Sequence, residues 1–316
     1  MTPRLEQTLL GATFQNPVLL AAGTAGYGRE LDELIDLDRL GGLVTKAVTV
    51  EPRAGNPAPR AAEFGAGMLN SIGLANVGIE RFVDEKLPWL ESRLTRAQVL
   101  VNVAGKSAAE FAEVVRALHP HGGFLGFEIN VSCPNVKEGG RLFSASEQAL
   151  TEVVRAVRAE TDRPMSVKLS PAVPDIGAMA EAAVAAGADA LTLINTFPGL
   201  LFDLDTRRPL LGAGSGGVSG PAVLPMGVYA VSRARARVDV PIIGVGGIRS
   251  GADAMQYLLA GASLVEIGTA SFADPRAADR VLSDLMDLCR RGGVRDVAEL
   301  VGAGVRDAAA TDDRRI

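Results

Sequence analysis

Three residues whose side chains can transfer protons or form hydrogen bonds are close together in the sequence, just after an apolar run. Asn130, Cys133 and Asn135 follow the run at 124–129, and a proline between them cannot continue a strand because it lacks a backbone N–H. A thiol beside two carboxamides indicates proton chemistry on a polar, planar ligand. The chain holds one other cysteine, Cys289, which we predict to be a packed structural thiol in a helix.

Other apolar runs also carry polar residues near their ends. They are Lys46, Asn102, Lys168, Asn195 and Thr196, and a long polar segment adds Asn70 and Asn76. A polar side chain in an apolar strand costs free energy unless a partner satisfies it. Each amide alone could bind the backbone, but the whole set favours a ligand site. No acid lies near either lysine in its own run, so we expect Lys46 and Lys168 to face an anion or an electron-rich ring.

Two later runs end in glycines directly before expected helices. The glycines are Gly246 and Gly247 in one run and Gly268, followed by Thr269, in the next, and 216–220 could add a third arm. Glycines let backbone N–H groups approach an anion, and a helix start favours negative charge. The pattern predicts a phosphate site, with close packing of glycines at turns as the alternative.

Eight apolar runs alternate with amphipathic stretches and must position these residues. The runs are 17–23, 41–49, 98–105, 124–131, 164–171, 188–196, 240–248 and 262–270; helical stretches include 107–118, 146–160, 175–186, 221–236, 251–260 and 280–290. Near-continuous apolar runs are typical of parallel strands covered on both faces. We predict a single (β/α)8 TIM barrel domain over 1–316. A doubly wound open sheet is the alternative, but no G-x-G-x-x-G follows the first run.

Two long segments interrupt the alternation. They cover 50–75 and 196–219, and both are rich in glycine, proline and polar residues. Long loops in compact domains are commonly functional, and in a barrel both would lie at the carboxyl ends of the strands. We expect 306–316 to be a flexible tail.

Composition excludes several classes of function. Hydrophobic residues make up 47% of the chain, the net charge is −5 and there is no long basic run, so nucleic acid and anionic membranes are poor partners. No apolar stretch reaches about 18 residues and the first residues lack a secretory signal, so we expect a cytoplasmic protein. His119 and His121 lie in a Pro/Gly turn and there is no CxxC or HExxH, so we expect no metal.

Several motifs, in the same order, resemble those of the dihydroorotate dehydrogenases. They are the segments 51–60, 70–74, 130–135, 194–196 and 246–247, and the resemblance runs from about residue 10 to about residue 275. The chain is most similar to class 1B, the NAD-linked catalytic subunits. Class 2 members use serine in place of Cys133 and carry an N-terminal extension. The resemblance implies an FMN barrel that oxidises (S)-dihydroorotate to orotate in pyrimidine (UMP) biosynthesis.

The resemblance also implies a role for each site residue. Cys133 would be the general base that removes the C5 proton, while FMN accepts the C6 hydride. An unperturbed cysteine has a pKa of about 8.5, so activity should rise with pH unless positive charge lowers that pKa. FMN would be bound by Ala22, Gly23, Lys46, Ala47, Asn102, Asn130, Lys168, Ile194, Gly220, Gly246, Gly247, Gly268 and Thr269, the last four holding the phosphate. Substrate would be bound by Lys46, Asn70, Ser71, Ile72, Gly73, Leu74, Asn130, Asn135, Asn195 and Thr196.

This chain departs from the family pattern at two site positions. Ala22 stands where many relatives have serine, so a hydroxyl contact with the flavin is missing. Val77 replaces a proline that is common after Asn76, which would loosen that loop. The stretch after about residue 288 has no match in the pattern.

Class 1B enzymes work with a second subunit that carries FAD and a 2Fe-2S cluster and passes electrons to NAD. This chain lacks a cysteine cluster for iron and sulfur, so the resemblance implies a separate partner in a heterotetramer around a homodimer. Alternatives are a class 1A, fumarate-linked enzyme and a dihydropyrimidine dehydrogenase-type FMN barrel. A non-redox isomerase or aldolase and a barrel that only binds its ligand are further alternatives.

Overall fold

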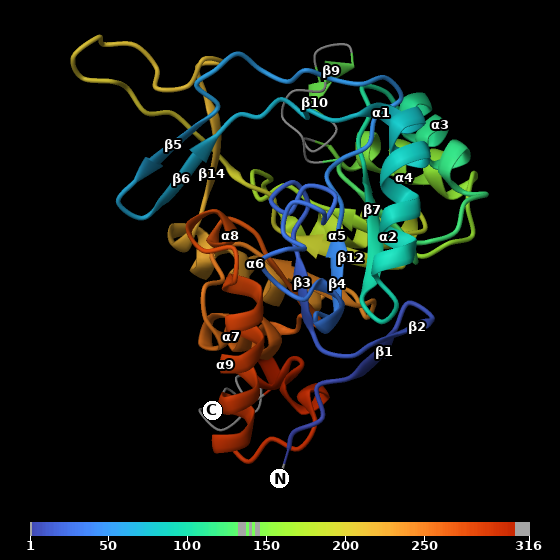
Figure 1. The fold of residues 1–316 in the computed structure, drawn as a ribbon, viewed down its shortest axis with the longest axis vertical. Coiled ribbons are helices and arrows are strands. Elements are labelled where there is room, and N and C mark those ends of the chain that lie inside the picture. Colours follow the sequence, from blue (N-terminus) through green and yellow to red (C-terminus); the bar gives the residue numbers. More distant parts are fainter. Residues whose placement is uncertain (1, 132–136, 139–140, 143–145, 307–316) are drawn as a thin grey trace, which may run out of the picture.

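A closed barrel of eight parallel strands forms the centre of the molecule, in the order β11-β12-β15-β16-β3-β4-β7-β8 (Figure 1). The computed structural model describes residues 2–131, 137–138, 141–142 and 146–306. The strands are β3 (Val18–Leu20), β4 (Gly42–Val44), β7 (Gln98–Val103), β8 (Gly126–Ile129), β11 (Met165–Lys168), β12 (Ala190–Leu193), β15 (Ile242–Val245) and β16 (Leu264–Ile267). Each lies within one of the eight predicted apolar runs, so the predicted (β/α)8 barrel is confirmed.

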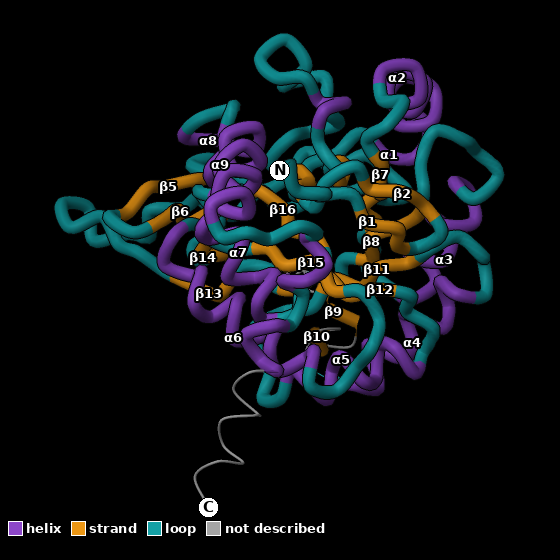
Figure 2. The backbone as a smooth tube through the Cα atoms, turned by 90° about the horizontal axis from the view of Figure 1, so that it is seen from below, coloured by secondary structure: helices purple, strands orange, loops and turns teal. Residues whose placement is uncertain are grey.

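Helices surround the barrel, as the view along its axis shows (Figure 2). They are α1 (Gly78–Arg81), α2 (Leu87–Arg93), α3 (Ala108–Leu118), α4 (Glu147–Arg158), α5 (Ile176–Ala185), α6 (Leu224–Arg235), α7 (Gly251–Ala260), α8 (Ala270–Ala273) and α9 (Ala277–Arg291), with a π-helical turn at Phe82–Lys86. The side chains of Ser107, Ser146 and Asp175 accept backbone N–H bonds at the starts of α3, α4 and α5.

The connection between β3 and β4 differs from the predicted β/α alternation. It contains turns and one 3₁₀ turn, Leu37–Arg39, but no α-helix. Gly23, Gly26 and Gly28 in this connection all have positive φ angles, which an α-helix cannot contain. The first unit of the barrel therefore lacks the α-helix that a regular (β/α)8 pattern would place there.

The inside of the barrel is apolar at one end and polar at the other. Leu19, Leu100 and Leu264 belong to a buried apolar cluster at the amino ends of the strands, which also includes Phe14, Val44 and Ile243. Phe14 ends the hairpin formed by β1 (Gln7–Leu9) and β2 (Ala12–Phe14). Two residues further along their strands, Asn102 and Glu266 occupy the same inner face, because side chains alternate between the two faces of a strand. The polar half lies at the carboxyl ends, where barrel enzymes build their sites.

The two predicted insertions pair with each other in a four-stranded antiparallel sheet beside the barrel (Figure 1). The first insertion supplies β5 (Ala61–Phe64) and β6 (Gly67–Asn70), and the second supplies β13 (Phe197–Gly199) and β14 (Gly216–Ser219), in the order β13-β14-β6-β5. The positions of the insertions were predicted correctly, but their pairing was not predicted. A separate short pair joins β9 (Lys137–Glu138) to β10 (Arg141–Leu142).

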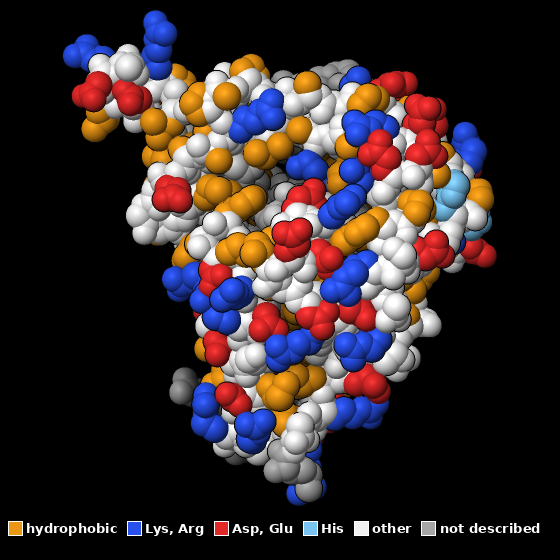
Figure 3. Space-filling view, viewed as in Figure 1, with side chains coloured by type: hydrophobic (Ala, Val, Ile, Leu, Met, Phe, Trp, Pro, Cys, Tyr) orange, Lys and Arg blue, Asp and Glu red, His pale blue; other side chains and the backbone are white. Residues whose placement is uncertain are grey.

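The insertion sheet has an exposed apolar edge. Leu200, Phe202 and Leu204, on the segment after β13, expose 46%, 54% and 88% of their surfaces. On the face drawn in Figure 3, acidic and basic side chains are interspersed and no patch of a single sign dominates.

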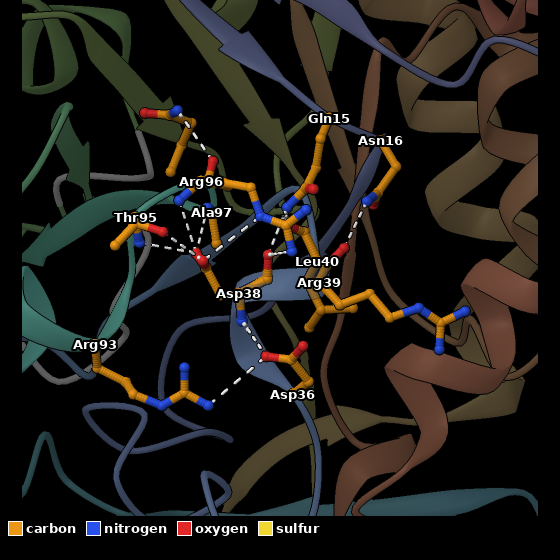
Figure 4. Close-up of polar contacts among 11 residues, drawn as sticks. Gln15, Asn16, Asp36, Asp38, Arg39, Leu40, Arg93, Thr95, Arg96 and Ala97 are labelled. Atoms are coloured by element: carbon orange, nitrogen blue, oxygen red, sulfur yellow. Dashed lines mark hydrogen bonds and ion pairs between the residues drawn. The ribbon is translucent and has the colours of Figure 1, made fainter.

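Asp38 ties together the amino ends of three strands (Figure 4). Its Oδ1 accepts backbone N–H bonds from Thr95, Arg96 and Ala97 at 2.9, 2.7 and 2.9 Å, and its Oδ2 accepts the Thr95 hydroxyl at 2.7 Å. Burial acts to raise the pKa of Asp38, but these hydrogen bonds outweigh it and lower that pKa from 3.8 to about 2. Gln15 adds a bond from its Nε2 to the Asp38 carbonyl at 2.7 Å.

Three further observations concern the described part of the chain. None of its helices is long and apolar enough to cross a membrane. It contains no group of three or more His, Cys, Asp or Glu residues that could hold a metal ion. Cys289 is fully buried in α9, as predicted for a packed thiol, and burial raises its pKa. Of the expected tail, 307–316 lies outside the described residues.

Candidate active site

The predicted FMN residues lie at the carboxyl ends of all eight barrel strands. Ala22 and Gly23 follow β3, Lys46 and Ala47 follow β4, Asn102 is near the end of β7, Asn130 follows β8, Lys168 ends β11, Ile194 follows β12, Gly246 and Gly247 follow β15, and Gly268 and Thr269 follow β16. Gly220 follows β14 of the insertion sheet. Residues up to 247 positions apart in sequence therefore meet at one end of the barrel. Cys133 and Asn135 lie outside the described residues.

The two glycines after β15, which are predicted to hold a phosphate, have a backbone geometry that favours glycine, and a side-chain hydrogen bond fixes the residue that follows the glycine after β16. Gly246 and Gly247 have φ angles of 127° and 77°, which side-chain-bearing residues rarely adopt. A Cβ on Gly247 would lie 2.8 Å from the backbone nitrogen of Leu224. Thr269 Oγ1 donates to Ser219 Oγ at 2.8 Å, which links β16 to the insertion sheet. Ser219 was not among the predicted site residues, although it lies within the predicted third arm at 216–220.

The barrel interior offers a buried acceptor next to the strand ends. Asn102 is fully buried, and its Nδ2 donates to Glu128 Oε1 at 2.6 Å. Its Oδ1 has no hydrogen-bond partner among the described residues. Gly23 has a φ of 84°, and a Cβ added there would meet nothing within 4 Å. An unsatisfied carbonyl oxygen and an open backbone position both fit a polar ring such as a flavin.

Lys168 has two acidic partners, although its own strand carries no acid, as the sequence showed. Its Nζ lies 3.4 Å from Glu128 Oε1 and 3.3 Å from Glu266 Oε2, and all three side chains are buried. Burial acts to lower the pKa of Lys168, but the charges of Glu128 and then Glu266 outweigh it and raise that pKa. The two acids come from β8 and β16, not from the strand of Lys168 itself. The sequence could have indicated both partners, because each is an acidic residue inside an otherwise apolar run.

Lys46 lies near a second cation. Burial lowers the pKa of its ammonium group; Glu30 acts to raise that pKa and Arg60 lowers it further. Arg60 is fixed by bonds from its Nε to the Asn56 carbonyl at 2.5 Å and from its Nη2 to the Ala54 carbonyl at 3.0 Å. Two positive groups at the same end of the barrel favour an anionic ligand group such as a carboxylate. Arg60 was part of a quoted motif but was not predicted as a site residue.

The predicted amide residues come together across the barrel rim and the insertion sheet. Asn195 Nδ2 donates to Asn130 Oδ1 at 3.3 Å. Asn70 Nδ2 donates to the Gly217 carbonyl at 3.3 Å, and a Cβ on Gly217 would collide with the Thr196 side chain. The structure therefore places Asn70, Asn130, Asn195 and Thr196 as neighbours, although three separate segments supply them.

The segment 71–74 is held against the first half of its own insertion. Asn56 Nδ2 donates to Ser71 Oγ at 2.7 Å, and the Asn56 N–H donates to the Ile72 carbonyl at 3.0 Å. Gly73 has a φ of 74°, and Leu74 has a φ of 55°, which is uncommon for a residue with a side chain. Strained backbone of this kind is concentrated at ligand sites, in agreement with the predicted substrate role of this segment.

Val77 makes a contact that a proline could not make. Its N–H donates to the Tyr27 hydroxyl at 3.5 Å. Asn76 fixes the same loop, because its Nδ2 donates to Thr49 Oγ1 at 2.8 Å and its Oδ1 accepts the Gly78 N–H at 2.9 Å. The expectation that valine loosens this loop finds no support in these contacts.

A (β/α)8 barrel whose strand ends bring together glycines, amides and a buried lysine belongs to the class of barrel proteins that carry an enzyme site at this end. The match to known proteins is more specific. Residues 4–289 match the dihydroorotate dehydrogenase family. The chain belongs to the dihydroorotate dehydrogenase family, a family of flavin-dependent oxidoreductases, and the predicted enzyme class is confirmed.

Individual relatives cover nearly the whole chain. The chain is 46% identical to the "Dihydroorotate dehydrogenase B (NAD(+)), catalytic subunit" of Geotalea daltonii, over 95% of this chain and 98% of the relative. It is 49% identical to a "Putative dihydroorotate dehydrogenase A (fumarate)" of Solibacter usitatus, over 96% and 99%. A crystal structure of DHODH in complex with ferulenol from Eimeria tenella superposes with a TM-score of 0.78 at 25% identity, over 96% of this chain and 89% of that one. The predicted similarity to class 1B catalytic subunits is confirmed.

Proposed function

We propose that this chain oxidises dihydroorotate to orotate with Cys133 as the general base and FMN bound at the barrel rim. FMN, when bound, supplies the acceptor for the C6 hydride. The observation that carries the proposal is the convergence of the family's FMN residues on all eight strand ends, beside the unsatisfied Oδ1 of Asn102. Gly246, Gly247, Gly268 and Thr269 would hold the phosphate, and Lys168 would meet the ring.

The neighbouring amides support a planar imide as substrate. Asn70, Asn130 and Asn195 lie together at the rim, and a carboxamide is the kind of group that can donate to and accept from the alternating edge of a dihydropyrimidine ring. Lys46 and Arg60 add positive charge. A carboxylate on the ligand would balance that charge, which favours dihydroorotate over dihydrouracil because dihydrouracil lacks this group.

The electron acceptor is a separate part of the proposal. The relatives named as NAD-linked catalytic subunits support a partner subunit carrying FAD and a 2Fe-2S cluster, in a heterotetramer around a homodimer. The relative named as fumarate-linked supports a class 1A enzyme as the second candidate. Copurification with an iron-sulfur subunit and turnover with NAD would support the first candidate. Turnover with fumarate by the chain alone would support the second.

Anaerobic mixing of the purified protein with dihydroorotate tests the reaction. We expect a yellow protein whose flavin absorbance bleaches on mixing. A protein without flavin would indicate an isomerase, an aldolase or a binding protein, and bleaching by dihydrouracil but not by dihydroorotate would overturn the substrate assignment.

Replacing Cys133 tests the base. Cys133→Ala should retain FMN but slow flavin reduction by about 10²–10⁴-fold, the usual contribution of general-base catalysis. Cys289→Ala is the matched control, since Cys289 is the other thiol and lies buried in α9. Equal rates in Cys133→Ala and wild type would refute the assignment.

A further inference from the structure

The polar half of the barrel interior contains a charge cluster of one lysine and two glutamates. Glu128 and Glu266 are completely buried, and Lys168, which is 6% exposed, bridges them. Asn102 completes the cluster by donating to Glu128. The predicted flavin site uses Lys168 and Asn102 but neither acid, so the glutamates need a separate explanation.

The two glutamates receive hydrogen bonds unequally. Glu128 Oε1 accepts from Asn102 Nδ2 at 2.6 Å and from Lys168 Nζ at 3.4 Å. Among the described residues, Glu266 Oε2 accepts from Lys168 Nζ at 3.3 Å, and the Glu266 side chain also lies within hydrogen-bonding reach of Glu128. Within the described part of the chain, Glu128 Oε2 and Glu266 Oε1 are buried without any donor. Two buried acceptor oxygens therefore lack a hydrogen that a carboxylic acid would provide.

The charge count points to the same missing hydrogen. Two carboxylates and one ammonium leave an uncompensated negative charge in a water-excluded interior, which is costly. One proton shared within the cluster makes it neutral and supplies a donor. Burial raises the pKa of Glu266, the charge of Glu128 raises it further, and Lys168 opposes both effects. Two donors reach the Glu128 carboxyl group and one reaches that of Glu266, so the geometry places the proton on Glu266.

No other described charge competes for this proton. The residues in register with Glu266 on the strands to either side are Leu19 and Val245, which cannot titrate. Lys46, on the far side of β3, is influenced by Glu30 and Arg60 and not by this cluster. Only Glu128 and Lys168 act on Glu266.

We propose that Glu266 is held as a neutral carboxylic acid inside the barrel, as a positioning residue that accepts a hydrogen bond from Lys168, leaves Glu128 as the counter-ion of that lysine and directs its ammonium group to the ring end of the flavin site. The role toward the flavin rests on the function proposed above, whereas the protonation of Glu266 does not. If Glu266 ionised, it would place a negative charge next to Lys168. The anionic reduced flavin would then lose part of the stabilisation that a nearby cation provides.

Infrared spectroscopy tests the protonation directly, with or without FMN. Protein labelled with ¹³C-carboxyl glutamate should show, at neutral pH, a protonated-carboxyl band that carries the isotope shift. The band should vanish in Glu266→Gln and should persist in Glu113→Gln, a control at an exposed position on α3. In Glu266→Asp the band should lose its isotope shift, which identifies the residue if the glutamine variant does not fold. Absence of the band in wild type, or its survival in folded Glu266→Gln, would overturn the proposal.

The flavin midpoint potential tests the consequence for the cofactor. Glu266→Gln preserves the neutral charge of the proposed acid, so the potential and its pH dependence should equal those of wild type. A raised potential in Glu266→Gln would show that Glu266 is ionised in wild type and would overturn the proposal. Failure of the protein to bind flavin would refute the proposed function instead and leave the infrared result valid.

Discussion

Replacing Asp38 with asparagine tests how the amino ends of β3, β4 and β7 are held together. The carboxylate accepts three backbone N–H groups and one hydroxyl, all from the segment Thr95–Ala97. Asparagine keeps an acceptor oxygen and nearly the same shape but removes the negative charge. The substitution therefore isolates the part of the stabilisation that depends on charge.

The size of the charge-dependent stabilisation follows from the lowered pKa of Asp38. Folding lowers the pKa of Asp38 from 3.8 to about 2, and this difference corresponds to about 2 kcal/mol of folding free energy. Because the folded pKa is the lower one, this stabilisation is complete above about pH 5. It falls as the pH drops toward about 2, and roughly half of it remains near pH 3. Asp38→Asn should cost about 2 kcal/mol at neutral pH, and the deficit relative to wild type should shrink in acid.

Urea unfolding followed by circular dichroism, at several pH values, measures this deficit. Asp36→Asn is the matched control, because Asp36 is exposed and caps the adjacent 3₁₀ turn, where aspartate and asparagine serve about equally. Asp38→Ala should cost more than Asp38→Asn, since it leaves the N–H groups without any acceptor. A deficit for Asp38→Asn that is the same at neutral and acid pH would refute the reasoning.

Three further predictions concern the site and the core. Gly247→Ala should weaken FMN binding by about tenfold or more in a fluorescence titration, because the φ of 77° and the 2.8 Å approach to Leu224 both exclude a Cβ. Gly11→Ala is the control: Gly11 has a similar φ of 74° but open space around it, so this substitution should leave FMN binding unchanged. Thr269→Val removes the bond to Ser219 and should weaken FMN binding by about five- to tenfold, and unchanged affinity would contradict a phosphate role. Leu100→Ala leaves a cavity in the apolar half of the barrel and should lower the unfolding free energy by about 2–5 kcal/mol, as measured by urea denaturation.

The barrel strands could be predicted because each is a short apolar run covered on both faces. The glycines after β15 and β16 could be located from the sequence because they end two of these runs directly before helices, while their role in binding a phosphate stays a prediction. The absence of an α-helix between β3 and β4 could not be predicted from the regular alternation of strands and helices in the other units. Its glycines have positive φ angles that only the folded chain reveals.

The partners of Lys168 illustrate why part of the site was missed. Searching along its own strand found no acid, because Glu128 and Glu266 reach it from β8 and β16. Sequence distance hides such contacts, whereas the closed order of the strands creates them. If alternate side chains of all eight strands are assumed to point into the barrel, an acid in the middle of one apolar run becomes a candidate partner for a lysine in another run.

The pairing of β6 with β14 has a consequence for protein engineering. These strands belong to insertions about 150 residues apart in sequence, and Asn70 lies opposite Gly217 in their shared register. A chimaera that joins the amino-terminal half of one relative to the carboxyl-terminal half of another would take the two strands from different parents. Loop exchange between relatives should therefore transfer 50–75 and 196–219 together, as a single cassette.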